Sequence, residues 1–240
     1  MKLNKPIPTI MFPTIHDYEI DLKEEQLKSL KEEGFVCFPY YYVSGIAGAI
    51  NECYVRESVL ELLKEARKKL PDNLDFKIYD AYRPIAVQQR LWDYYRSVVI
   101  GKNSGLSEDE IDIKTSFFVS KPSYDKNKPS LHNTGGAIDL TLIDKETGKE
   151  LNMGTEFDDF TNRAWTNHFE PTYEEHEDNE EIMLNRRILY NVMIDAGFTN
   201  LPSEWWHYDY GTKFWGYFKN KPTLYDGIIQ HNFKPVFPIT

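Results

Sequence analysis

Apolar residues recur at helical spacing in three stretches of the chain, and each stretch predicts an amphipathic helix. The first covers residues 55–70 and is stopped by Pro71, and the second opens at Pro84, because proline suits a first helical turn. The third covers about residues 184–196 and ends at Gly197. The positions expected to face the core are Val55, Val59, Leu62, Leu63, Ala66 and Leu70, then Val87, Leu91, Tyr95 and Val98, then Leu184, Ile188, Leu189, Val192, Met193 and Ala196.

Two further segments are defined by their charges. Residues 22–33 carry the acidic and basic pairing of an exposed helix, and Gly34 ends the stretch, so we expect a charged helix there. Residues 170–181 hold seven acidic side chains in twelve positions, which predicts a solvated loop and helix entry with His176 on the surface. The proline-rich residues 1–20 show no periodicity and are expected to be irregular.

Strands are indicated in three segments, residues 76–80, 137–142 and 204–210. In the second segment Asp139 shares the more polar face, opposite three large apolar residues, and a turn signal over residues 144–148 suggests a following hairpin. Helices before and between several strands predict the α+β fold class, with an antiparallel sheet and flanking helices. The sequence has no GxGxxG or P-loop pattern, so a nucleotide-binding doubly wound fold is not supported.

Length and charge narrow the possible functions. A chain of 240 residues suffices for one sizeable core, so we expect a single domain over residues 1–240. The net charge of −10 repels phosphate backbones and anionic lipid, so we expect no nucleic-acid or membrane partner. Two cysteines, Cys37 and Cys53, are too few for a disulfide framework, and the start does not read as a secretory signal. We therefore expect a cytoplasmic protein.

The first candidate for chemistry is the segment of residues 130–139, Ser-Leu-His-Asn-Thr-Gly-Gly-Ala-Ile-Asp. His132 and Asp139 are seven residues apart, and Gly135 and Gly136 between them let the chain bend so that both can face one point. Zinc readily takes imidazole nitrogen and carboxylate oxygen, and a catalytic site needs three protein ligands and one open position. Taken alone, the pair is equally compatible with a structural histidine and an aspartate near a turn.

Two more blocks offer groups that hydrolysis needs. Glu204-Trp-Trp-His207 supplies another imidazole and a carboxylate that could take the proton of a metal-bound water. Asp80-Ala-Tyr-Arg83 supplies a permanent cation that could stabilise an oxyanion, held by the aspartate three residues earlier. Each block alone is also compatible with a structural role. The chain contains no HExxH, which excludes the helical zincin arrangement.

Together the three blocks are much more specific. The patterns SxHxxGxAxD and ExWH, preceded by YDxYRP, resemble those of the D-alanyl-D-alanine dipeptidases, zinc enzymes in the wider group of peptidoglycan carboxypeptidases with a small α+β fold. The likeness runs from about Asn51 to Tyr210 and includes residues 51–56, 153–158 and 185–187. The resemblance implies one zinc ion per chain. The ligands that it implies are His132, Asp139 and His207, with Glu204 as catalytic base and Arg83 as transition-state stabiliser.

The resemblance also implies how a substrate is held. Ser130 and Asp158 match substrate-binding residues of this family, and Asp158 would hold the free ammonium of a dipeptide. Asp80 would orient the Arg83 guanidinium. One segment departs from the family: Phe38–Gly45 lacks the Asn-Phe pair usual there, which puts the exact dipeptide in question.

The expected activity is therefore hydrolysis of D-Ala-D-Ala or a closely similar D-amino-acid dipeptide, with this small peptide as the partner. One alternative is a peptidoglycan DD-carboxypeptidase or endopeptidase acting on longer stem peptides. A second is a non-catalytic domain that binds cell-wall peptide. The chain retains the three metal ligands, the base and the cation. This favours an enzyme, because binding alone requires neither Glu204 nor Arg83.

Overall fold

The computed structural model describes residues 3–12, 15, 18–170 and 177–229, and within them the fold class is α+β, as predicted. The helices are α1 (Tyr40–Val43), α2 (Glu57–Lys68), α3 (Ile85–Lys102), α4 (Glu108–Thr115), α5 (Glu177–Ala196) and α6 (Lys213–Lys219). The strands are β1 (Leu27–Ser29), β2 (Val36–Cys37), β3 (Tyr54–Arg56), β4 (Leu74–Asp80), β5 (Ala137–Asp144), β6 (Thr199–Asn200) and β7 (His207–Asp209).

The main sheet has the order β2-β4-β5-β7-β6, and its centre is the antiparallel pair β4–β5. The register of this pair shifts between Ile78 and Asp80, so that Asp80 lies opposite Asp139. On its other side β5 pairs antiparallel with β7, which places His207 opposite Asp139 as well. Three adjacent strands thus bring three residues of the predicted site together.

One strand pair departs from the antiparallel sheet expected from the sequence. Strand β2 runs parallel to β4 and forms an edge of the sheet, which is therefore mixed. Between them the chain passes through α1, β3 and α2, and a crossover of this length permits parallel pairing. Strands β1 and β3 form a separate antiparallel pair.

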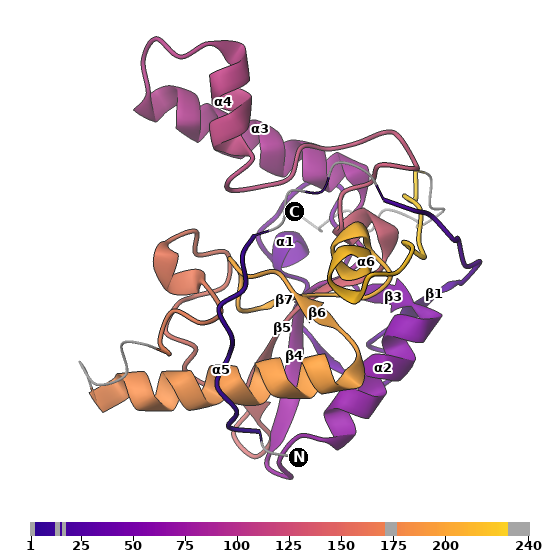
Figure 1. The fold of residues 1–240 in the computed structure, drawn as a ribbon, viewed down its shortest axis with the longest axis vertical. Helices are drawn as coiled ribbons and strands as arrows, with labels where there is room; N and C mark the ends of the chain where they lie inside the picture. Colours follow the sequence, from indigo (N-terminus) through magenta and orange to yellow (C-terminus); the bar gives the residue numbers. More distant parts are fainter. Residues whose placement is uncertain (1–2, 13–14, 16–17, 171–176, 230–240) are drawn as a thin grey trace.

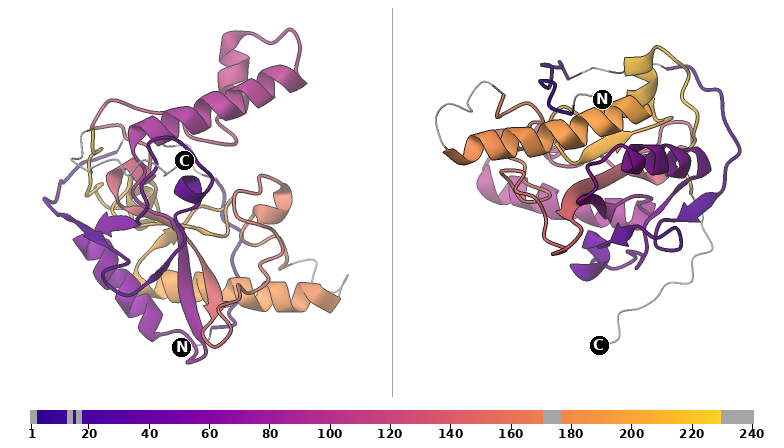
Figure 2. Two further views of the ribbon diagram at one scale, coloured as in Figure 1. Left: turned by 180° about the vertical axis from the view of Figure 1, so that it is seen from behind. Right: turned by 90° about the horizontal axis from the view of Figure 1, so that it is seen from below.

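The apolar face of β5 lies in the hydrophobic core. Ile138, Leu140 and Leu142 are fully buried, and α5 contacts β5 and packs on α2. Figure 1 and Figure 2 show α5 crossing the sheet on one side, while α3 and α4 extend away from the sheet at one end. Asp139 and Thr141, on the other face of β5, are buried too. A buried carboxylate requires polar or charged partners, so this second face is where the site forms.

The charged helix predicted for residues 22–33 is wrong. Leu27–Ser29 form β1 and pair with β3, and the Phe35 N–H then donates to the carbonyl of Leu30, which is fully buried. Exposed charge pairs stabilise a helix by only about 0.2–0.5 kcal/mol each. Strand pairing and burial of Leu30 outweigh that contribution.

The first two amphipathic helices are confirmed with shifted ends. Helix α2 begins at Glu57, because the backbone of Val55 is engaged in the β1–β3 pair. Pro84 caps α3 from outside the first turn. On α3 the buried residue near the end is Val99, while the predicted Val98 is only half-buried.

The third helix is also confirmed, but it starts earlier than predicted. Helix α5 begins at Glu177, and Leu184 is 36% exposed, so its predicted core position is wrong. Ile182 and Met183 are buried instead, in a small cluster with Phe169. Packing of Ile182 and Met183 against Phe169 therefore sets the buried side of the helix at this end.

Glu170, the first residue of the acidic run, is only partly exposed. Glu170 forms an ion pair with Arg187 of α5 and accepts a hydrogen bond of 2.8 Å from the Ile7 N–H, so it fixes the N-terminal segment. His176, which was predicted to lie on the surface, belongs to residues 171–176, which are outside the described part of the chain. The described residues among 1–20 are irregular apart from a bridge at Ile20, as expected.

The three strand predictions are confirmed with changed ends: β4 begins two residues earlier than predicted, β5 ends two residues later, and β7 is shorter. The turn after β5 closes a hairpin, since the Gly148 N–H donates to Asp144 and Ile143 bridges to Glu150. Of the predicted strand 204–210 only His207–Asp209 pair in the sheet, because residues 204–206 form a turn before it. Among the described helices, none combines the length and apolar composition needed to cross a bilayer.

Candidate metal and catalytic site

The three predicted metal ligands come from two strands and the turn that leads into one of them. Asp139 lies on β5 opposite His207 on β7, and His132 opens the short 3-10 turn that precedes β5. Gly135 ends this turn with a left-handed φ of 74°, and a Cβ there would lie 2.6 Å from Leu27 Cδ2. Glycine at this position therefore permits both the turn and the close approach of β1.

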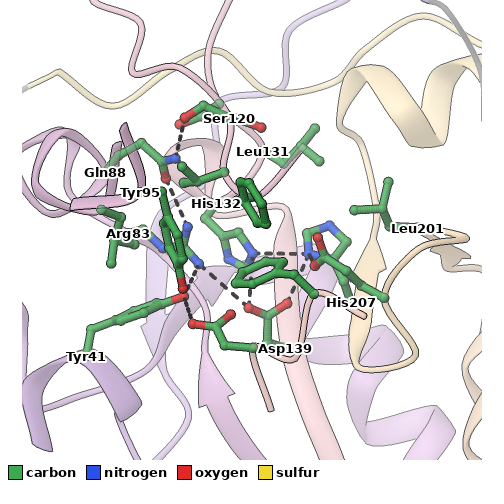
Figure 3. A pocket seen from close by; sticks show the side chains of 17 residues that line it. Tyr41, Arg83, Gln88, Tyr95, Ser120, Leu131, His132, Asp139, Leu201 and His207 are labelled. Carbon is green, nitrogen blue, oxygen red and sulfur yellow. Dashed lines mark hydrogen bonds and ion pairs between the residues drawn. The ribbon is translucent and has the colours of Figure 1, made fainter. Parts of the chain in front are cut away.

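The ligand atoms of these residues converge on one point, as Figure 3 shows. His132 Nε2 lies 3.1 Å from His207 Nδ1 and 3.3 Å from Asp139 Oδ2, and His207 Nδ1 lies 2.9 Å from Asp139 Oδ1. All three side chains are buried. Ligand atoms about 2.0–2.1 Å from a tetrahedral zinc ion are about 3.3 Å apart. The cluster thus has the donor types and separations that zinc requires.

The second nitrogen of each imidazole is also engaged. His132 Nδ1–H donates to the Ala81 carbonyl over 2.8 Å, and His207 Nε2–H donates to Asp209 Oδ2 over 3.0 Å. These bonds leave His132 Nε2 and His207 Nδ1 free to present lone pairs to the cluster. Burial alone would raise the pKa of Asp139, but the two imidazoles lower it by more than burial raises it. The pKa is therefore well below the usual range, and the carboxyl is ionised.

Glu204 stands beside the cluster without being part of it. Its Oε2 lies 3.9 Å from His207 Nδ1, and the residue lines the pocket, where it is partly accessible. Burial raises the pKa of Glu204 to about 7; His207 opposes this shift and the Asp139 charge supports it. A carboxyl with such a pKa can both accept and release a proton near neutral pH.

Arg83 is held by several acceptors at the edge of the pocket. Its Nε donates to Asp80 Oδ2 over 2.8 Å, and one terminal nitrogen donates to Gln88 Oε1 over 2.9 Å. The other terminal nitrogen lies 3.7 Å from Asp139 Oδ2. Burial alone would lower the pKa of Arg83, but Asp80 and the other nearby groups raise it by more than burial lowers it. The guanidinium therefore stays charged. The contact of Asp80 with Arg83 agrees with its predicted orienting position.

Asp158 lines the same pocket as Arg83 and interacts with its charge. It has a positive φ of 60°, and its Oδ2 accepts a hydrogen bond of 2.9 Å from the Tyr41 hydroxyl. Burial raises the pKa of Asp158 to about 7, although Arg83 and the Tyr41 hydroxyl oppose the shift. The loop that carries Asp158 is fixed by Arg186, whose Nε donates to the Met153 carbonyl over 2.8 Å. The loop thus presents a partly desolvated carboxyl to the pocket.

Ser130 is buried in the wall of the same small pocket, a cavity of about 60 Å³. The structure therefore brings every sequence-predicted site residue to one pocket, except Asp80, which lies behind two of the lining residues, Arg83 and His132. Pocket residues that the sequence did not indicate as part of the site include Tyr41, Gln88, Tyr95, Phe118 and Phe160.

These additional residues differ in how far the sequence could have indicated them. Tyr41 lies in the segment that departs from the family pattern, and its hydroxyl also accepts from Arg83 over 3.3 Å. Gln88 lies in the first turns of α3 and links Arg83 to the Ser120 carbonyl. Tyr95 and Phe118 stack at 5.8 Å across the α3–α4 region, a contact that no local pattern predicts.

The pocket combines a buried His-Asp-His cluster with a neighbouring carboxyl group that can exchange protons. This combination is that of a metallopeptidase, which is the class of protein that the pocket defines. Comparison with family models then gives the particular family. The model described as D-Ala-D-Ala dipeptidase matches residues 39–224, and the chain belongs to this family. The family and the enzyme class predicted from the sequence are confirmed.

Individual relatives agree with the family assignment. The D-alanyl-D-alanine dipeptidase of Synechocystis is 30% identical over 213 residues, which cover 82% of this chain and 83% of the relative. The enzyme of that name from Escherichia coli is 29% identical over 64% of each chain, and the one from Enterococcus faecium is 30% identical over 61% of this chain and 67% of its own.

Two solved structures are more distant. The complex of VanYB with D-alanine-D-alanine aligns with a TM-score of 0.44 at 15% identity, covering 72% of this chain and 82% of that chain. The Zn(II) complex of a variant of the vancomycin resistance D,D-pentapeptidase VanY aligns with a TM-score of 0.42 at 16% identity, covering 67% and 74%.

Proposed function

We propose that this protein is a zinc-dependent dipeptidase that hydrolyses free D-Ala-D-Ala or a closely similar D-amino-acid dipeptide. The observation that carries the proposal is the convergence of His132 Nε2, His207 Nδ1 and the Asp139 carboxylate within 4.8 Å of one another in a buried pocket. The names of the curated relatives support the substrate. We assign one zinc ion per chain to these three ligands.

Zinc in such a site lowers the pKa of bound water and polarises a carbonyl group. The protein's own contribution begins with Glu204, which takes a proton from the attacking water and gives it to the leaving amine. Its pKa of about 7 suits both steps, because it accepts and releases a proton at similar cost near neutral pH. Its place beside His207, outside the ligand set, supports this role.

Arg83 stabilises the negative charge that develops on the scissile carbonyl oxygen. Its guanidinium is charged, fixed by Asp80 and Gln88, and directed at the same pocket as Asp139. A donor fixed in advance requires little reorganisation during the reaction.

We expect Arg83→Ala to lower kcat by about 10²- to 10³-fold with a smaller effect on KM, because the oxyanion exists only in the transition state. Arg83→Lys should recover little of this loss, since an ammonium cannot reproduce the bonds to Asp80 and Gln88. Steady-state kinetics with D-Ala-D-Ala give both constants. A change confined to KM would instead make Arg83 an anchor for the substrate carboxylate.

Asp158 and Ser130 are proposed to hold the two ends of the dipeptide. Burial makes the Asp158 carboxylate costly to ionise, and an ammonium group placed against it would offset that cost. Ser130, which lines the pocket two residues before His132, would contact the substrate backbone or its carboxylate. Charged ends at a fixed separation then select a free dipeptide.

N-acetylated D-Ala-D-Ala should therefore be cleaved at least ten-fold less efficiently than the free dipeptide. Acetylation removes the ammonium charge and leaves Asp158 without its partner, which costs about 1–3 kcal/mol. Asp158→Asn should narrow the difference by slowing cleavage of the free dipeptide, and asparagine tolerates the positive φ at this position. The measurement is kcat/KM for both peptides and a stem-length peptide.

Asp159→Asn is the matched control, because this neighbouring carboxylate accepts the Thr161 N–H and does not line the pocket. It should leave the preference for the free dipeptide unchanged. Efficient cleavage of the acetylated or stem-length peptide would contradict the dipeptidase proposal and indicate a carboxypeptidase. Binding of the dipeptide with no hydrolysis by the zinc-loaded protein would indicate a binding domain.

A further inference from the structure

Asp209 is a fully buried carboxylate on the far side of the His207 ring from the cluster. It lies two residues after His207 on β7, and alternate residues of a strand point to the same face. Its Oδ2 accepts the His207 Nε2–H over 3.0 Å, and its Oδ1 accepts the Thr212 hydroxyl over 2.8 Å. Asp209 therefore contacts a predicted ligand without belonging to the ligand set.

We propose that Asp209 is a positioning residue that holds His207 in the orientation and tautomer needed for metal binding. The proposal rests on the zinc site of the proposed function and adds a residue to it. A carboxylate behind a ligating imidazole accepts the proton of the second ring nitrogen, which fixes the ring and makes the ligand more basic.

The tautomer matters here because His207 Nδ1 lies only 2.9 Å from Asp139 Oδ1. If the proton of a neutral ring were on Nδ1, His207 would donate to Asp139, and two ligand atoms would be engaged with each other. The bond to Asp209 favours the proton on Nε2, so that Nδ1 keeps its lone pair. Asp209 thus opposes a hydrogen bond that competes directly with the metal.

The charge of Asp209 also fits a cation in the cluster. Among the described residues the direct side-chain partners of Asp209 are one imidazole and one hydroxyl, and Lys213 lies near enough to interact with its charge without forming an ion pair. A fully buried carboxylate is costly without an opposite charge. A divalent ion held by the Asp139 carboxylate would leave one positive charge, which Asp209 would help to balance.

The two imidazoles are supported differently, and this gives the proposal a specific consequence. The His132 Nδ1–H donates to the Ala81 backbone carbonyl, an acceptor that no side-chain substitution removes, and Asp80 Oδ2 lies 3.3 Å from the same nitrogen. For the His207 Nε2–H the acceptor is the side chain of Asp209. Thr212 in turn holds Asp209 and caps α6 by accepting the Trp215 N–H over 3.3 Å. Loss of the Asp209 carboxylate should therefore release one ligand of the cluster.

The test is zinc affinity, measured by competition with a chromophoric chelator on the full-length parent, Asp209→Asn and Asp209→Ala. We expect Asp209→Ala to weaken zinc binding about 10- to 100-fold. Asp209→Asn should weaken it less, because its amide oxygen can still accept from His207 while the charge is lost. Asp75→Asn is the control, since Asp75 is a buried carboxylate on β4 that pairs with Arg67 outside the pocket. Its zinc affinity should equal that of the parent.

The outcomes separate this proposal from the proposed function. A parent protein that binds no zinc refutes the zinc site itself. A parent that binds zinc tightly, with Asp209→Asn and Asp209→Ala both within two-fold of it, overturns only the role of Asp209. If Asp209→Ala does not fold, as judged by circular dichroism, Asp209→Asn decides: weaker binding than Asp75→Asn supports the proposal, and equal binding overturns it.

Discussion

Replacement of His132 or His207 by alanine is expected to abolish zinc binding and, with it, hydrolysis. Each change removes one of three converging ligand atoms. A catalytic zinc site uses three protein ligands, and the remaining imidazole and carboxylate do not form such a site. Elemental analysis of the purified variants gives the zinc content, and D-alanine release gives the activity.

His168→Ala is the matched control for this prediction. His168 is a described histidine that does not line the pocket, and its removal should leave zinc content and activity at parental values. Full zinc occupancy in both His132→Ala and His207→Ala would contradict the ligand assignment. Cobalt also accepts nitrogen and oxygen ligands, so the same variants should lose cobalt when it replaces zinc.

Glu204→Gln should retain zinc and lose hydrolysis, which separates the base from the ligands. Glutamine has the size of glutamate but cannot take a proton from water, and general-base contributions are about 10²- to 10⁴-fold. Zinc should remain, because Glu204 stands 3.9 Å from His207 Nδ1 and is not among the converging ligand atoms. Turnover and zinc content of the same preparation check both parts.

Glu156→Gln serves as the control for this change. Glu156 is an exposed carboxyl in the loop that carries Asp158, and it does not line the pocket. Its replacement should change turnover less than two-fold. A Glu204→Gln protein with near-parental turnover would show that another group takes the proton of the attacking water.

The local chemistry of the site could be predicted from the sequence because its residues lie in short, ordered motifs. His132 and Asp139 flank a glycine turn, and Glu204 lies in the short turn that leads directly into His207, the first residue of β7. Within each motif the chain itself fixes the separation. The β5–β7 register then brings Asp139 and His207 together, and the alternation of residues in β5 already indicated which face Asp139 takes.

Other features depend on contacts between distant segments, which no local pattern contains. The strand at Leu27–Ser29 forms because β3 is available to pair with it, although its own residues favour a helix. Tyr41 contacts Asp158 across 117 positions of sequence. The parallel β2–β4 pair likewise follows from the path of the chain through α1 and α2.

Asp209 shows a third situation, in which the signal was present but ambiguous. It is two residues from His207 in a predicted strand, so a shared face was foreseeable. An aspartate in an aromatic segment is equally compatible with an exposed strand end. The Thr212 hydroxyl at the start of α6 and complete burial distinguish the two cases, and both are tertiary properties.

The central claim is that the His-Asp-His cluster is the zinc centre of a D-Ala-D-Ala dipeptidase, and a metal titration tests it most directly. Protein freed of metal by a chelator is titrated with zinc while the release of D-alanine from free D-Ala-D-Ala is measured. We predict no activity without metal, and a rise that saturates at one zinc ion per chain. Hydrolysis by the metal-free protein, or no hydrolysis at full zinc occupancy, would contradict the claim.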